Sequence, residues 1–233
     1  MNLVAPADAV AMIPDGSAVA FGRPPALGLV RELIRVGRRE LDLVGVPTGG
    51  IAIELLIAAG CARSLHSSGV DLGELGQAPA FARAVESGAL AVTDSTCPAL
   101  LMALQAGASG IPWTPVPGLI GSDLLTRRPD IKVVDGWAIV PALAPQFAIV
   151  HARRADPAGN AVIATTYDDR LLIQAAGTVI MSVDEVRPGA TDQLAFGEQV
   201  VPAAYIDVLT VLPAEDADAA TTAYLESISV HSG

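Results

Sequence analysis

A short apolar run that leads into a polar turn is the part of this sequence best suited to carry chemistry. Phe147 to Val150 has the composition of a buried strand, and Ala155-Asp-Pro-Ala-Gly-Asn160 forms the turn. His151 between them could act as a general base, although a histidine at a strand end is more often a hydrogen-bonded structural residue. Asp156 and Asn160 are typical of side chains that close turns by bonding the local backbone. We expect these three residues to brace the wall of a site.

A second segment of interest is a strand near the N-terminus. The tight turn Asp15-Gly16 leads into an apolar run that ends at Phe21, and Gly22 follows directly. Ligands of α/β proteins bind at the carboxyl ends of strands, and glycine allows a ligand to approach the backbone closely. An ordinary strand with turn glycines produces the same pattern, so this motif alone indicates a site only weakly.

The third segment is an uncharged loop rich in proline and glycine, from Gly110 to Gly121. Ordered loops of this length are often functional. Gly121, Ser122 and Asp123 have the pattern of a helix start with Ser122 as the N-cap. The free N–H groups of that helix's first turn could bind an anion. A purely structural crossover loop explains the pattern equally well.

Several sequence patterns of known enzyme classes are missing. The chain has no Gly-x-Ser-x-Gly, no Gly-x-x-x-x-Gly-Lys-Ser/Thr, no His-Glu-x-x-His and no complete Gly-x-Gly-x-x-Gly motif. The adjacent acids Asp168 and Asp169 are interpreted as a helix start, and Asp216 and Asp218 as part of a solvated tail. We expect no metal site, because the two cysteines, Cys61 and Cys97, have no ligand-like spacing.

Composition limits the classes of partner. Apolar residues make up 52% of the chain, aromatic residues 4% and charged residues 17%, which predicts an aliphatic core of buried parallel strands covered by helices. The formal charge of −11 argues against binding nucleic acid or anionic membranes.

The cysteine usage and the N-terminus, which lacks the features of a signal peptide, favour a cytoplasmic location. Residues 95–122 carry no charge, but their prolines and glycines exclude a membrane span.

The elements expected along the chain alternate between strand and helix. This order predicts an open, largely parallel α/β sheet flanked by helices, in a single domain over residues 1–233. From about residue 214 the chain is acidic and rich in alanine, which predicts a helical tail that frays. Strands are expected at residues 17–21, 41–46, 63–66, 90–93, 131–134, 138–140, 147–150, 178–183 and 206–212, and helices at 26–39, 51–59, 79–87, 97–106 and 167–175.

Taken in order, these segments resemble the A (α) subunits of family I coenzyme A transferases, of the glutaconate and 3-oxoacid type, from about Pro14 to Pro213. The first family pattern is Asp-Gly, two residues, three apolar residues, Gly-Gly-Phe, three residues, Gly, one residue and Pro. Asp15-Gly16, Val19–Phe21, Gly22 and Gly28 match it, whereas Arg23, Pro24 and Val30 stand where Gly, Phe and Pro are usual. Further segments that resemble family motifs are Val92–Thr96, Ile111–Pro115 with Gly121–Asp123, His151–Asn160 and Ala175–Val186.

The resemblance implies a fold shared with some sugar-phosphate isomerases, and it implies that the partner is a homologous B subunit. A Glu of this partner would attack the acyl-CoA thioester and form glutamyl-CoA, while the chain itself shapes the acyl pocket. Coenzyme A would be a substrate, with no permanently bound cofactor, and no certain catalytic residue would lie in this chain. The residues implied for the substrate and CoA pocket are Gly22, Arg23, Ser68, Gly69, Ser95, Thr96, Gly121 and Ser122.

Two departures from the family pattern leave alternatives open. Asp94 stands where the related steroid ring-cleaving CoA hydrolases have a catalytic Glu, which makes Asp94 a weak candidate for a catalytic carboxylate. Pro117 stands where many relatives have an Arg, so a bidentate clamp for a carboxylate is lost. The alternatives are a CoA-ester hydrolase or retro-Claisen enzyme, and a non-catalytic protein that binds acyl-CoA.

Overall fold

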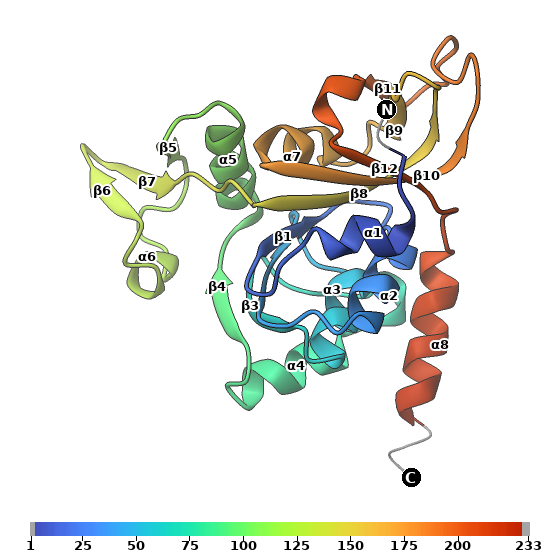
Figure 1. The fold of residues 1–233 in the computed structure, drawn as a ribbon. Coiled ribbons are helices and arrows are strands. Elements are labelled where there is room, and N and C mark those ends of the chain that lie inside the picture. Colours follow the sequence, from blue (N-terminus) through green and yellow to red (C-terminus); the bar gives the residue numbers. More distant parts are fainter. Residues whose placement is uncertain (1–2, 230–233) are drawn as a thin grey trace.

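A twisted, mostly parallel sheet forms the centre of the molecule (Figure 1), as the computed structural model shows for residues 3–229. Its nine strands include seven that run parallel, and their order confirms the predicted α/β class. From one edge to the other the parallel strands are β12 (Val208–Val211), β10 (Thr178–Val186), β8 (Phe147–Ala155), β1 (Ala18–Phe21), β2 (Leu41–Gly45), β3 (Ala62–Ser67) and β4 (Ala91–Asp94).

Helices cover both faces of this sheet because its strands are apolar on both sides. Val19 and Phe21 of β1 point into one core, and Ala20 between them points into the other. The first core lies under α1 (Pro6–Ala11), α2 (Leu27–Arg35) and α3 (Ile51–Ala58), with α4 (Pro79–Glu86) packed against α3; the second lies under α5 (Cys97–Ala108) and α7 (Asp169–Ala175).

Two antiparallel strands that the sequence did not reveal extend the far end of β8. They are β9 (Ala161–Ala164), which pairs with β8, and β11 (Glu198–Val201), which pairs with β9. Both are four residues long and β11 is polar at its start, so neither shows a clear alternating pattern. The 3₁₀ turns Gly73–Leu75 and Ala203–Tyr205 complete the connections.

A separate three-stranded antiparallel sheet projects from one side of the molecule (Figure 1). It contains β5 (Trp113–Val116), β7 (Trp137–Pro141) and β6 (Lys132–Val134), with the short helix α6 (Leu124–Arg127) beside them. The expectation of a loop throughout residues 110–121 was therefore wrong. Although β5 carries a proline, it lies at the edge of its sheet, where a missing N–H donor is tolerated.

The acidic C-terminal segment forms the predicted helix, and its described part packs against the body of the molecule. Helix α8 (Ala217–Ser229) lies against α3, and Ala220 and Leu225 contact the first core. The hydroxyl of Tyr224 donates a 2.7 Å hydrogen bond to the Glu54 carboxylate, which is fully buried. The sequence predicted a helix here, but not that its first turn, which contains Asp218, borders the site described next.

Candidate functional site

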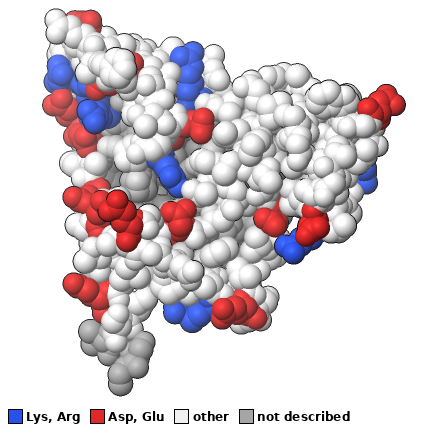
Figure 2. Space-filling model, turned by 180° about the vertical axis from the view of Figure 1, so that it is seen from behind, with Lys and Arg blue, Asp and Glu red and all other residues white. Residues whose placement is uncertain are grey.

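A cavity of about 300 Å³ opens where β1 and β2 end. Gly22 and Arg23 after β1 form one wall, and the loop from Thr48 to Gly50 after β2 forms another. Tyr167 and the first turn of α8 close the rim. Figure 2 shows the surface hollowed beside α8, with charged side chains around the opening. The place agrees with the general rule that ligands of open α/β sheets bind at the carboxyl ends of strands.

Arg23 supplies the guanidinium of this cavity. Its Nη2 donates hydrogen bonds of 2.7 Å to both the carbonyl oxygen and Oγ1 of Thr48. Among the described residues, no carboxylate forms an ion pair with Arg23. The side chain is therefore held in place by neutral partners, and its remaining donors are available to an anionic or carbonyl oxygen of a ligand.

A buried carboxyl group lies directly behind this wall. Oδ1 of Asp169 accepts a 2.8 Å hydrogen bond from the backbone N–H of Arg23. Burial raises the pKa of Asp169 to about 7, with a smaller contribution from Asp168, and the hydrogen bond from Arg23 opposes the shift. Gly22 is needed here, because a Cβ at that position would lie 2.9 Å from Oδ1 of Asp169 and 2.8 Å from Cγ1 of Val150.

The N-terminus of α3 forms the floor beside Arg23. Gly50 is its N-cap residue, and no side chain caps the helix. Ile51 and Ala52 of the first turn line the cavity. Uncapped N–H groups and the positive end of the helix dipole stabilise negative charge. Together with Arg23 they make this wall suited to a carboxylate or to the oxygen of a thioester carbonyl.

Ser68 and Gly69 follow β3 and were predicted to line the pocket. They lie behind the Thr48–Gly50 loop and do not line the cavity. The carbonyl oxygen of Gly69 accepts a 2.8 Å hydrogen bond from Gly49 N–H, and the Ser68 hydroxyl donates one of 2.7 Å to the Pro47 carbonyl. Oγ of Ser68 also lies 3.2 Å from Sγ of Cys97. These contacts hold the loops after β2 and β3 together.

Ser95 and Thr96, which were also predicted to line the pocket, follow β4 at the same edge of the sheet. Ser95 is buried, and Oγ1 of Thr96 caps α5 by accepting a 3.3 Å hydrogen bond from Ala99 N–H. The side chain of Asp94 is 50% exposed and lies 3.7 Å from Nη1 of Arg127. Asp94 does not line the cavity between β1 and β2.

Gly121 and Ser122 are not brought to this edge. They belong to the connection between β5 and α6 and do not line the cavity. The prediction that Ser122 caps a helix was wrong, because its hydroxyl donates to the Leu119 carbonyl and the N-cap residue is Asp123. Helix α6 has only four residues, so it is too short to provide an anion-binding N-terminus.

His151 is a buried residue of β8. It lies two residues after Ile149, which pairs with the last residue of β1. Its Nδ1 is 2.8 Å from Oγ of Ser182, and its Nε2 is 3.3 Å from Oδ1 of Asp184 without hydrogen-bond geometry. Burial lowers the pKa of His151, and Asp184 partly offsets this shift. The ring borders a hollow shared with Pro24 and Tyr167, next to the main cavity.

Asp156 and Asn160 bond to each other across their turn. Oδ1 of Asp156 accepts from Asn160 N–H at 3.0 Å, and Oδ2 accepts from Nδ2 of Asn160 at 2.8 Å. Oδ1 of Asn160 in turn accepts from Ala203 N–H at 3.0 Å. Both side chains thus connect the β8–β9 turn to the segment after β11.

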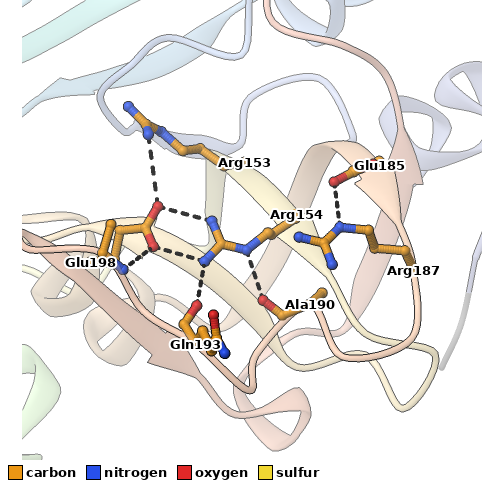
Figure 3. A network of polar contacts seen from close by, with 8 residues as sticks. Arg153, Arg154, Glu185, Arg187, Ala190, Gln193 and Glu198 are labelled. Atoms are coloured by element: carbon orange, nitrogen blue, oxygen red, sulfur yellow. Dashed lines mark hydrogen bonds and ion pairs between the residues drawn. The ribbon is translucent and has the colours of Figure 1, made fainter.

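A polar network fixes the same end of β8 (Figure 3). The Arg154 guanidinium forms two hydrogen bonds to Glu198 of β11, at 2.9 and 2.7 Å, and further bonds to the carbonyls of Ala190 and Gln193. The hydrogen bonds from Arg154 to Glu198, together with one from the backbone N–H of Ala195, lower the pKa of Glu198 to about 2. The network holds the antiparallel extension on the parallel sheet.

Three important positions were not singled out from the sequence. Thr48 lies in a Pro-Thr-Gly-Gly turn between a strand and a helix, a signal of the same kind as the one used for Gly22. Asp169 was interpreted only as a helix start, and its burial comes from contacts distant in sequence. Glu54 shows no local pattern that would reveal its bonds to Tyr224 and to the N–H groups of Ala80 and Phe81.

Over residues 3–229, no group of three His, Cys, Asp or Glu side chains is placed to hold a metal ion. In the same range, no helix combines the length and the apolar composition needed to cross a membrane.

A family model described as Coenzyme A transferase matches residues 4–211. The chain therefore belongs to the coenzyme A transferase family. It is 35% identical over 141 residues to the A-type chain of 3-oxoadipate CoA-transferase from Pseudomonas knackmussii, covering 57% of this chain and 50% of that protein. It is 29% identical over 198 residues to the IpdA chain of the cholesterol ring-cleaving hydrolase from Rhodococcus jostii, covering 77% of this chain and 66% of that one.

Solved structures show the same fold. A variant of the decarboxylase AibA/AibB superposes with a TM-score of 0.80 at 31% identity, covering 91% of this chain and 83% of that chain. Glutaconate coenzyme A-transferase from Acidaminococcus fermentans gives a TM-score of 0.83 at 21% identity, covering 91% and 76%. The chain spans about half the length of the curated relatives it matches, 43% and 50% of two of them.

Proposed function

We propose that this chain is the A (α) subunit of a heteromeric CoA-transferase, which moves CoA between an acyl-CoA and a carboxylic acid. The observation that carries the proposal is the cavity after β1 and β2, in which the Arg23 guanidinium and the uncapped start of α3 share one wall. Both are suited to an oxygen that gains negative charge during acyl transfer. Apolar residues such as Phe21, Ile51 and Leu72 line the rest and suit an acyl group.

The reacting carboxylate is proposed to come from a Glu of a B subunit. Its attack on the thioester carbonyl forms an anhydride and releases CoA thiolate, and the thiolate then attacks the Glu carbonyl. The products are glutamyl-CoA and the free acid, and a second acid reverses both steps. Two carboxylates line the cavity. Asp71 accepts a hydrogen bond from Gly73 N–H in its own turn, and Asp218 lies in the first turn of α8. Because both have these local structural positions, they support a nucleophile that comes from outside this chain.

Coenzyme A and its acyl esters are proposed as substrates rather than as bound cofactors. Ser68, Gly69, Ser95 and Thr96 after β3 and β4 are proposed to shape the path of the CoA moiety along the sheet edge. A cytoplasmic location is also proposed, since Cys61 and Cys97 are both free, as is usual in a reducing compartment.

The test is an exchange assay with and without a B-type chain of the family. The chain is purified alone and as a co-expressed complex, and transfer of CoA to an isotopically labelled carboxylic acid is measured by mass spectrometry. We expect exchange only for the complex. Exchange by the isolated chain at a rate similar to that of the complex would contradict the proposal.

A second candidate is hydrolysis of a CoA ester with Asp94 as the base. Its carboxylate is half exposed at the end of β4 and lies near Arg127, and a chain of a ring-cleaving hydrolase is among the relatives. Asp94→Asn separates the two candidates, because a transferase that uses a Glu of its partner keeps most of its rate, whereas the hydrolase loses it.

A further inference from the structure

The cavity after β1 and β2 is lined by one cation and two carboxylates. Within the described part of the chain, Arg23 is the only Lys, Arg or His of the lining, and Asp71 and Asp218 are its only acids. Arg23 follows β1, Asp71 follows β3, and Asp218 lies in the first turn of α8. One positive and two negative charges leave the lining at −1, in a chain whose formal charge is −11.

Neither carboxylate is neutralised by a cation of this chain. Over residues 3–229, Asp71 and Asp218 form no ion pair, and both residues are exposed. Acidic side chains are also prominent around the hollow beside α8 (Figure 2). The mouth of the cavity therefore presents negative charge to a ligand that enters it.

The guanidinium of Arg23 belongs to the reacting end of the ligand. The carbonyl oxygen and Oγ1 of Thr48 hold its Nη2 at 2.7 Å, next to the uncapped start of α3. In the proposed function these groups bind the thioester oxygen or the carboxylate that exchanges CoA. Among the described residues, no further cation lines the cavity that could pair with a second carboxylate.

The inner part of the cavity is apolar. Its large apolar side chains are those of Phe21, Ile51, Ile53 and Leu72, which are between 1% and 8% exposed and belong to the first core. An aliphatic chain that packs against them gains from the removal of apolar surface from water. A carboxylate in the same place would lose its water without gaining a partner, which costs free energy.

We propose that this cavity selects acyl groups without a second carboxylate, and that Asp71 and Asp218 determine this specificity. The inference rests on the proposed function, because it places the acyl group in this cavity. The distal carboxylate of a dicarboxylic acyl group meets two like charges at the mouth and an apolar surface inside. Unpaired charges of this kind are a means by which a site rejects a competing ligand. The substrate class is therefore CoA esters of aliphatic monocarboxylic acids.

Three acyl-CoAs that differ at one position test this selection. Butyryl-CoA, β-alanyl-CoA and succinyl-CoA carry a methyl, an ammonium and a carboxylate group, respectively, on the same carbon. The complex of this chain with its B-type partner is incubated with each ester and its own isotopically labelled acid, and kcat/KM for exchange is measured by mass spectrometry. We expect kcat/KM for butyryl-CoA and β-alanyl-CoA to exceed that for succinyl-CoA about tenfold or more. An equal or higher value for succinyl-CoA would overturn the proposal.

The double variant Asp71→Asn with Asp218→Asn tests the two carboxylates. Asparagine keeps an oxygen that can accept the hydrogen bond from Gly73 N–H, while both charges are removed. The ratio of kcat/KM for butyryl-CoA to that for succinyl-CoA should fall about fivefold or more. The matched control is Glu74→Gln with Glu226→Gln, which removes two exposed charges from the same loop and the same helix outside the cavity. Equal ratios in the double variant and its control would overturn the assignment.

Ionic strength provides a second readout of the charges. Raising the salt concentration from about 0.1 to 1 M shortens the Debye length from about 10 to about 3 Å. Because Asp71 and Asp218 are exposed, the discrimination against succinyl-CoA should decrease in the wild-type complex and change little in the double variant. The same salt dependence in both complexes would contradict a role of these two charges.

Binding measurements separate this inference from the proposed function. Dethia analogues of the three esters, in which a methylene group replaces the thioester sulfur, are titrated into the complex by calorimetry. We expect the butyryl and β-alanyl analogues to bind about tenfold or more tightly than the succinyl analogue. Weaker binding of the succinyl analogue without exchange of any ester would contradict the proposed function alone. Exchange of all three esters with similar kcat/KM and similar affinities of the analogues would overturn this inference alone.

Discussion

The backbone N–H of Arg23 donates a 2.8 Å hydrogen bond to Oδ1 of Asp169, a residue 146 positions further along the chain. This bond joins the loop after β1 to the start of α7. It also places the carboxyl group of Asp169 behind the cavity wall. Burial raises the pKa of this group to about 7. The conformation of the Gly22–Arg23 turn therefore depends on a group whose charge changes near neutral pH.

Asp169→Asn should make folding stability less dependent on pH. The folded pKa is about 7 and the reference value is 3.8, so the contribution of the wild-type carboxyl is fully present below pH 3.8 and is lost as the pH rises through about 7. At pH 8 the variant should be more stable than the wild type by about 1 to 4 kcal/mol. Urea unfolding at pH 5 and pH 8 measures this, with Asp8→Asn on the surface as the control. A wild-type chain of equal stability at both pH values would contradict it.

Gly22→Ala should destabilise the fold by about 1 to 3 kcal/mol. The added Cβ would lie 2.8 Å from Val150 and 2.9 Å from Asp169, both of which are buried and unable to retreat freely. Gly50→Ala is the matched control, because its nearest neighbour is 3.9 Å away. Thermal unfolding of both variants tests the difference, and equal melting temperatures would contradict the close packing of Val150 and Asp169 around Gly22.

The Glu54 carboxylate should govern the docking of α8. Tyr224→Phe removes one hydrogen bond to it and should cost about 1 kcal/mol. Glu54→Ala should cost more, because it also leaves the N–H groups of Ala80 and Phe81 without their buried acceptor. Limited proteolysis should release α8 sooner in both variants, with Ser227→Ala on the same helix as a comparison.

The Arg154–Glu198 pair should stabilise the fold near neutral pH and make its stability fall in acid. Hydrogen bonds from Arg154 lower the pKa of Glu198 from 4.5 to about 2, so this contribution is present above pH 4.5 and is lost as the pH falls through about 2. Glu198→Gln should therefore reduce stability at pH 7 and flatten its acid dependence. Glu185→Gln, in a half-exposed pair with Arg187, should change little. Similar acid profiles for both variants would count against a special role of the network.

Arg23→Met should impair acyl-CoA turnover by the complex about tenfold or more, with the larger effect on kcat if Arg23 stabilises the transition state. Arg63→Met serves as the control, because Arg63 is exposed and pairs with Asp42 on the opposite end of the sheet. Circular dichroism confirms that both variants are folded. Unchanged kcat and KM in Arg23→Met would remove Arg23 from the site.

The sequence was sufficient for the central sheet because its signals are local. Apolar runs bounded by glycine, such as Leu41 to Gly45, predict buried strands without knowledge of their neighbours, and family motifs place them in order. The short strands β9 and β11 were missed because they are stabilised by pairing with each other and with β8. Strand β5 was missed because its proline argued against a strand, although an edge position tolerates it.

In the candidate site too, only residues with a local sequence signal could be predicted. Gly22 could be expected beside a ligand because glycine after a buried strand has a local meaning. The raised pKa of Asp169 could not be expected, because it arises from burial under chain segments far away in sequence. Gly121 and Ser122 were placed in the pocket by resemblance to a motif, and the connection between β5 and α6 holds them elsewhere.

The location of the covalent intermediate tests the central proposal most directly. The complex of this chain with its B-type partner is incubated with acyl-CoA, treated with hydroxylamine, digested and mapped by mass spectrometry. The proposed mechanism predicts a hydroxamate on one Glu of the partner and an unmodified Asp94 in this chain. A hydroxamate on Asp94, or on any other carboxylate of this chain, would contradict it.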